Sequence, residues 1–212
     1  MHTGKMFVSN KMVGRIGLGC VTFGREIDQA ASFAMMDHAA ANDILFFDTA
    51  SAYAAGESEK IVGEWLAARK QLADAVVVAT KILPPYDAQS IIQSVDASRR
   101  RLGKEQIDLL FLHRWDDAVL TAETLEALDR LVQDGIVVEI GASNFSVGQL
   151  EQAVQKQLQY HWQPFSFAQN NHNYAVREYT PAFQKLCEAH HIDIMLTPRS
   201  APQWIENFEA NA

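Results

Sequence analysis

Apolar positions along the chain follow two alternating patterns, one continuous and one periodic. Segments in which apolar residues recur every three or four positions predict amphipathic helices. These segments are residues 28–42, 58–71, 88–103, 121–135, 146–159 and 177–191. Short runs of consecutive apolar residues, many of them β-branched, predict strands covered on both faces, as in a parallel sheet. The runs are residues 16–21, 44–48, 75–81, 107–113, 136–143, 165–170 and 192–197.

The helix ends carry recognisable signals. The clearest apolar stripe spans residues 125–132, Ser146 occupies the position of an N-cap, and Gly103 and Gly135 stand where helices end. Strands that alternate with helices are joined by right-handed crossovers. No Gly/Ser-rich or low-complexity stretch interrupts the alternation, so residues 1–212 are expected to form a single domain.

The alternation suits either a doubly wound open sheet or a (β/α)8 barrel. A doubly wound dinucleotide fold would show G-x-G-x-x-G between its first strand and helix. Gly17, Gly19 and Gly24 lie in that region without the required spacing, which argues against this fold. A barrel instead gathers its functional residues at the carboxyl ends of its strands.

The composition excludes several classes of protein. With 26 acidic and 18 basic residues, the net charge is −8, which leaves no electrostatic footprint for nucleic acid and no polybasic membrane patch. No apolar run is long enough for a membrane helix, and the first residues lack the apolar region of a signal peptide. Cys20 and Cys187 form no disulfide framework, so we expect a cytoplasmic protein.

Ionisable and amide side chains stand at the ends of five consecutive predicted strands. They are Asp48 with Tyr53 in the following loop, Lys81, His113, Ser143 with Asn144, and Gln169 with Asn170. Each has a simpler explanation when taken alone, such as a loop cap for Asp48, a surface phenol for Tyr53 or a packed imidazole for His113. Their joint appearance at one rim of a barrel favours a functional site.

This set of side chains suits the reduction of a carbonyl group. A lysine beside a tyrosine stabilises the phenolate and lowers a pKa that is normally about 10. Asp48 would keep Lys81 charged, Tyr53 would donate a proton near neutral pH, and His113 would polarise the substrate oxygen. Side chains cannot deliver hydride, so a nicotinamide cofactor is implied. No set of histidine and acidic residues has the spacing of a zinc motif, and no metal is expected.

From Arg15 to Ile194 the chain resembles the aldo-keto reductase superfamily. The motifs that carry the resemblance are GLGCVTFG (17–24), FFDTASAYAAGESEKIVGEWL (46–66), VVVATK (76–81), RRLGKEQIDLLFLHRWD (100–116), LDRLVQDGIVVEIGASNFS (128–146) and FAQNNHN (167–173). The resemblance implies a (β/α)8 barrel that binds NADPH in an extended form. It also implies a small-molecule carbonyl substrate.

The resemblance assigns roles residue by residue. Tyr53 would be the general acid, with Asp48, Lys81 and His113 as its catalytic partners. The cofactor would be bound by Gly19, Thr22, Asp48, Ser143, Asn144, Gln169 and Arg199. Ser143, Asn144 and Gln169 would hold the nicotinamide carboxamide, while Arg199 stands about where the family has an aromatic residue that stacks on the nicotinamide.

The resemblance also implies parts that this sequence does not show. We expect the eighth strand, the basic segment that grips the adenosine 2′-phosphate and the final helices to be absent after residue 197, which leaves NADH open beside NADPH. Open barrel edges would invite self-association. Three explanations remain open: later residues missing from the sequence, a short form completed by a second chain, or a degenerate protein without turnover.

Two functions follow as alternatives. One is an NADPH-dependent oxidoreductase that acts on an aldehyde, ketone or sugar carbonyl. The other is a non-catalytic protein of the same fold that senses the cofactor or binds a partner.

Overall fold

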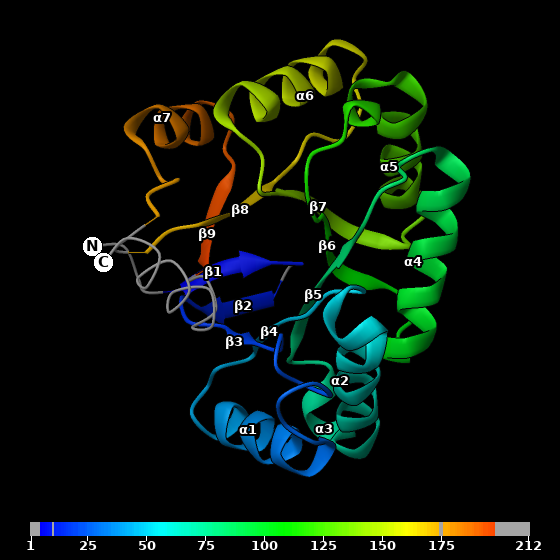
Figure 1. Ribbon diagram of the computed structural model, residues 1–212, viewed down its shortest axis with the longest axis vertical. Coiled ribbons are helices and arrows are strands. Elements are labelled where there is room, and N and C mark those ends of the chain that lie inside the picture. Colours follow the sequence, from blue (N-terminus) through cyan, green and yellow to red (C-terminus); the bar gives the residue numbers. More distant parts are fainter. Residues whose placement is uncertain (1–4, 10, 174–175, 198–212) are drawn as a thin grey trace, which may run out of the picture.

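The computed structural model describes residues 5–9, 11–173 and 176–197, and its centre is a curled sheet of seven parallel strands (Figure 1). Strands that are neighbours in the sheet are also consecutive along the chain. In sheet order they are β3 (Leu18–Gly19), β4 (Phe46–Asp48), β5 (Val77–Ile82), β6 (Ile107–Leu112), β7 (Val137–Ser143), β8 (Phe167–Asn171) and β9 (Asp193–Thr197). Within the described residues, the predicted fold, a (β/α)8 barrel that lacks its eighth strand, is confirmed.

The helices lie around the outside of the curled sheet (Figure 1). They are α1 (Gln29–Ala41), α2 (Glu57–Ala68), α3 (Lys70–Ala73), α4 (Ala88–Leu102), α5 (Ala122–Gln133), α6 (Val147–Gln159) and α7 (Pro181–Ala189), with 3-10 turns η1 (Tyr53–Gly56) and η2 (Asp117–Leu120). Ser146 caps α6 in a reciprocal pair with Gln149, and Gly103 ends α4 at φ 63°. Gly135, at φ 70°, directly follows Asp134, the C-cap of α5. The predicted helix signals are therefore confirmed.

An N-terminal hairpin, β1 (Lys5–Val8) and β2 (Lys11–Gly14), holds the two strands that the sequence patterns did not predict. Figure 1 shows it in the middle of the ring of strands. Val8 and Val13 are buried in the interior cluster with Phe46 and Phe111. The hairpin therefore closes the amino-terminal end of the barrel and leaves the carboxyl ends of the strands as the open mouth.

Two further apolar clusters fix the helices to the sheet. One lies between the first strands and α1 and α2, where the Phe47 and Trp65 rings meet edge to face at 5.3 Å. The larger one lies under α4 to α7 and includes Leu110, Leu128 and Leu150. Each such side chain contributes about 1.5–3 kcal/mol by leaving water, so the strand ends rest on a firm scaffold.

The sheet has two edges in the described part of the chain. There β3 pairs only with β4, and β9 pairs only with β8. Self-association through these edges stays a prediction. Arg199, which the resemblance assigned to the cofactor, lies outside the described residues. Among those residues, no helix combines the length and the apolar character needed to cross a membrane.

Candidate functional site

Strand alternation explains why two ionisable side chains point into the barrel. Successive residues of a strand face opposite sides of the sheet. In β4, Phe46 belongs to the interior cluster and Phe47 to the outer one, so Asp48 faces the interior again. In β5, Ala79 is interior and Lys81 follows two residues later. The two side chains therefore meet inside the mouth.

Lys81 is the centre of the site. Its ammonium is 2.6 Å from Asp48 Oδ1, 2.9 Å from the Thr49 carbonyl oxygen and 3.5 Å from Tyr53 Oη. Lys81 is 1% exposed and Asp48 8%. An ammonium has three N–H donors, and here each has an acceptor. The predicted meeting of Asp48, Tyr53 and Lys81 at one rim is therefore seen in the geometry. The Thr49 carbonyl had no signal in the sequence because backbone acceptors leave none.

The charge states in the site differ in one respect from the expectation. Burial alone would lower the pKa of Lys81, but Asp48 and Tyr53 outweigh it and hold that pKa above 10.5. For Tyr53, burial raises the pKa more than Lys81 lowers it, so the pKa lies above 10.0. The expectation that Lys81 brings the phenol close to neutral pH is therefore not met by this geometry. The lysine is charged, and the phenol keeps its proton.

His113 lies beside the phenol. The Tyr53 and His113 rings meet edge to face, with centroids 5.8 Å apart. Its Nδ1 is buried and has no hydrogen-bond partner among the described residues. Burial, with the Lys81 charge next in size, lowers the pKa of His113 to about 4. The imidazole is therefore neutral at pH 7 and can form a hydrogen bond without carrying charge.

The amide residues gather on the far side of the mouth. Ser143 and Gln169 are register partners in β7 and β8, and the Asn144 N–H donates to the Gln169 carbonyl at 2.9 Å. Asn144 has φ 59°, and its Nδ2 donates to the His113 carbonyl oxygen at 2.8 Å and to Ser143 Oγ at 3.0 Å. Asn144 thus ties the amides to the loop of His113.

Gln169 supplies an unused donor in this part of the site. Its side chain is 3% exposed, and its buried Nε2 has no hydrogen-bond partner among the described residues. A buried donor without a partner costs about 1–3 kcal/mol. This cost would be removed by a bound group that presents an acceptor, such as the oxygen of a carboxamide. The donor set therefore fits the nicotinamide that the resemblance implies.

Strand β3 borders the site at Gly19, where it leaves open space and makes few contacts. Gly19 pairs with Asp48, and a Cβ built on it would meet no atom within 4 Å. Thr22 lies in the turn after this strand, where its carbonyl oxygen accepts three N–H groups from residues 25–27. Gly19 therefore leaves the mouth open beside Asp48, and Thr22 shapes the loop that borders it.

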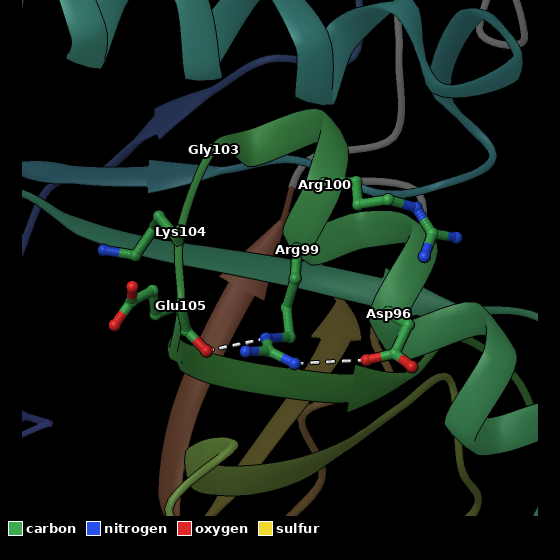
Figure 2. Close-up of a pocket in the computed structure, with 6 residues that line it drawn as sticks. All are labelled: Asp96, Arg99, Arg100, Gly103, Lys104 and Glu105. Carbon is green, nitrogen blue, oxygen red and sulfur yellow. Dashed lines mark hydrogen bonds and ion pairs between the residues drawn. The ribbon is translucent and has the colours of Figure 1, made fainter.

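Two surface hollows lie away from this mouth. One, of about 380 Å³, is shown in Figure 2, where the Arg99 guanidinium bridges Asp96 and the Glu105 carbonyl oxygen at the carboxyl end of α4. The other, of about 590 Å³, is a groove between α4 and α5. Neither includes a residue of the strand-end set. Within the described ranges, no group of three or more His, Cys, Asp or Glu could hold a metal ion.

A model of the Aldo/keto reductase family matches residues 15–201. The chain therefore belongs to the aldo/keto reductase family. An aldo-keto reductase from Klebsiella pneumoniae, solved in complex with NADPH, superimposes with a TM-score of 0.79 at 27% identity, over 92% of this chain and 68% of that one. The strand-end residues of this chain therefore lie on a fold that it shares with solved members of the family.

Curated relatives agree with this assignment. Norsolorinic acid reductase A of Aspergillus parasiticus is 31% identical over 199 residues, 84% of this chain and 51% of its own length. An uncharacterised oxidoreductase of Bacillus subtilis, YrpG, is 34% identical over 151 residues, 63% of this chain and 46% of its own length. The chain spans about half the length of the curated relatives it matches.

Proposed function

We propose that this chain carries the catalytic centre of an NADPH-dependent oxidoreductase that reduces an aldehyde, ketone or sugar carbonyl, with Tyr53 as the general acid. The observation that carries the proposal is the Lys81 ammonium held between Asp48 at 2.6 Å and Tyr53 at 3.5 Å. Membership of the aldo/keto reductase family and a relative solved with NADPH support it.

The charge states of the site suit this reaction. Tyr53 is protonated at neutral pH, because burial raises further a pKa that is ordinarily about 10, so the acid form is present. Reduction turns the carbonyl oxygen into an alkoxide, which is a stronger base than a phenolate and takes the phenol proton. The Lys81 charge then stabilises the phenolate that remains. Neutral His113 donates a hydrogen bond to the substrate oxygen during the reaction.

The amide residues and the space beside Gly19 suit the cofactor. Bound in the mouth, a nicotinamide would supply the hydride that no side chain can provide. Gln169 Nε2 is free to donate to its carboxamide oxygen, with Ser143 and Asn144 next to it. Thr22 and Asp48 border the open space at Gly19 and complete the proposed cofactor side of the site.

The test is NADPH oxidation, followed by absorbance, with a panel of aldehydes, ketones and sugars. Tyr53→Phe should lower kcat by about 100-fold or more, because a general acid contributes about 10²–10⁴-fold. Tyr160→Phe is the matched control: Tyr160 is 49% exposed, stacks on Trp162 and should leave kcat unchanged.

The outcomes separate the two functions that the sequence left open. Turnover that survives Tyr53→Phe would contradict the proposed role of the phenol. NADPH binding, measured by calorimetry, without turnover of any carbonyl would favour the cofactor-sensing alternative. If the chain neither binds NADPH nor turns over, both functions fail for it.

A further inference from the structure

The turn that carries Tyr53 has an unusual backbone. Ala54 and Ala55 have φ of 48° and 55°, and Gly56 has φ of 94°. Three consecutive left-handed residues are costly when two of them carry a Cβ, at roughly 1–2 kcal/mol for each such residue. Such a backbone persists only where the surrounding structure holds it. The contacts that hold this turn therefore decide where the phenol lies.

An ion pair outside the barrel, between a buried carboxylate and a partly exposed guanidinium, contacts the end of the turn. Glu59 is completely buried near the start of α2, and Arg101 reaches it from α4, with Nε at 2.6 Å from Glu59 Oε2. The stem of Arg101 covers Gly56, because a Cβ built on that glycine would lie 2.8 Å from Arg101 Cδ. The pair thus fixes the end of the turn from its outer side.

The same carboxylate is tied to the strand of Lys81. Thr80 Oγ1 donates to Glu59 Oε1 at 2.5 Å, and Thr80 precedes Lys81 in β5. Alternation along the strand sends Thr80 outward to Glu59 and Lys81 inward to the site. Glu59 therefore connects the backbone that carries the ammonium with the helix that follows the phenol.

We infer that Glu59 and Arg101 are positioning residues, a clamp that holds the strained 53–56 turn so that the Tyr53 hydroxyl stays within reach of the Lys81 ammonium. The inference rests on the proposed function, because the distance between the Tyr53 hydroxyl and the Lys81 ammonium matters only if Tyr53 is the general acid. The distance between the two groups is 3.5 Å, at the outer limit of a hydrogen bond, so a small displacement of the turn would separate them.

Amide hydrogen exchange of the 212-residue chain tests the clamp without any need for turnover. The Tyr53 N–H donates to the Ala50 carbonyl oxygen, and the Glu57 N–H donates to carbonyl oxygens of the turn, so both amides report on it. We expect Arg101→Lys and Glu59→Gln to speed exchange at these two amides at least tenfold. Amides of β6 and β7 should keep their protection.

The matched control is Arg69→Lys. Arg69 forms an ion pair with Asp37 at 2.8 Å, and its side chain is 31% exposed, as is that of Arg101. It stands at the carboxyl end of α2, away from the turn. The same substitution there should leave exchange at Tyr53 and Glu57 unchanged. If neither variant folds, Thr80→Val removes only the hydrogen bond to Glu59 Oε1 while both charges and the backbone of the turn remain, and it should speed the same two amides.

A second readout separates positioning from simple support. The phenol of Tyr53, followed by NMR of the chain labelled at tyrosine Cζ, should titrate above 10 in the unaltered chain, because burial dominates its pKa. Release of the turn exposes the phenol to water, so its pKa should fall toward 10 in Arg101→Lys. The Arg69→Lys variant should keep the original value.

The results decide the inference independently of the reaction. Lower global stability with unchanged exchange and titration at Tyr53 would overturn it and make the pair a structural contact only. If the chain turns over, kcat should fall at least tenfold in Arg101→Lys with KM little changed. If the unaltered chain shows no turnover, the proposed function fails while the exchange and titration results still decide whether the clamp exists.

Discussion

The two ends of the barrel each bury a carboxylate against lysine, but they use it differently. At the closed amino-terminal end, Asp108 accepts from Lys11 at 3.1 Å, from the Val78 N–H at 3.0 Å, and pairs with Lys104 at 2.7 Å. At the open mouth, Lys81 is the one ion-pair partner of Asp48 among the described residues. The closed end uses its charges to join three segments of the chain.

Unpaired groups mark the second difference. At the closed end Glu139 accepts from the Ser9 N–H at 2.6 Å and from Ser166 Oγ at 2.8 Å, so both its oxygens have donors. At the mouth, His113 Nδ1 and Gln169 Nε2 are buried without partners among the described residues. A buried polar group without a partner in a native protein calls for an explanation, and a ligand that binds there is one. The closed end therefore stabilises the fold, and under the proposed function the mouth keeps its unpaired groups for a bound cofactor.

The largest effect on stability is expected at the closed end. Asp108→Asn removes a buried charge that holds two lysines, and we expect the free energy of unfolding to fall by about 3 kcal/mol or more. Urea denaturation measures it, with an unchanged slope showing that the denatured state is not altered. Asp96→Asn breaks an exposed pair with Arg99 and should cost at most about 1 kcal/mol. A similarly small loss for Asp108→Asn would contradict the contrast between the two ends.

The next effect compares two buried glutamines. Gln157 is fully buried, donates to the Gln163 carbonyl oxygen and accepts from the Phe165 N–H, whereas the Gln169 Nε2 donor has no partner. Gln157→Leu should therefore cost about 1–3 kcal/mol in unfolding free energy. Gln169→Leu should be neutral or stabilise by about 1 kcal/mol, because it removes an unsatisfied group.

For cofactor binding, the substitution of Gln169 should have the larger effect, whereas for stability the substitution of Gln157 should have the larger effect. Calorimetry with NADPH should show weaker binding to the Gln169→Leu variant and unchanged binding to the folded Gln157→Leu variant. Equal losses of stability in both variants would show that the Gln169 amide has a partner in the molecule. The mouth would then not be organised for a bound carboxamide.

The order of strands and helices could be predicted because strands buried on both faces appear in the sequence as consecutive apolar residues, and helices buried on one face appear as apolar residues every three or four positions. The N-terminal hairpin could not, because Phe7 and Met12 are apolar on its outer face, 66% and 54% exposed. These residues blur the alternation that Val8 and Val13 would otherwise show. Ser9-Asn10 between the two halves was the one available turn signal.

The site was predictable in its members and not in its energetics. Strand ends share a rim in any barrel, so Asp48, Lys81 and His113 could be placed together from the chain alone. The direction of the Tyr53 pKa could not, because it depends on how deeply the tertiary structure buries the phenol. The clamp residue Arg101 gave no signal either, since its charge looks like any other on the polar face of α4.

The last effect depends on pH and sharpens the same contrast at His113. Its pKa of about 4 lies below the ordinary value of 6.5, so the unfolded chain binds the proton more tightly than the folded one. Stability should therefore fall as pH drops from 6.5 toward 4, and His113→Gln should flatten that part of the profile. NMR titration, assigned with the same variant, should show one imidazole that stays neutral at pH 5. If His113 instead titrates near 6.5, water reaches the imidazole more than its burial implies. His113 would then carry charge at a position where a neutral donor is proposed.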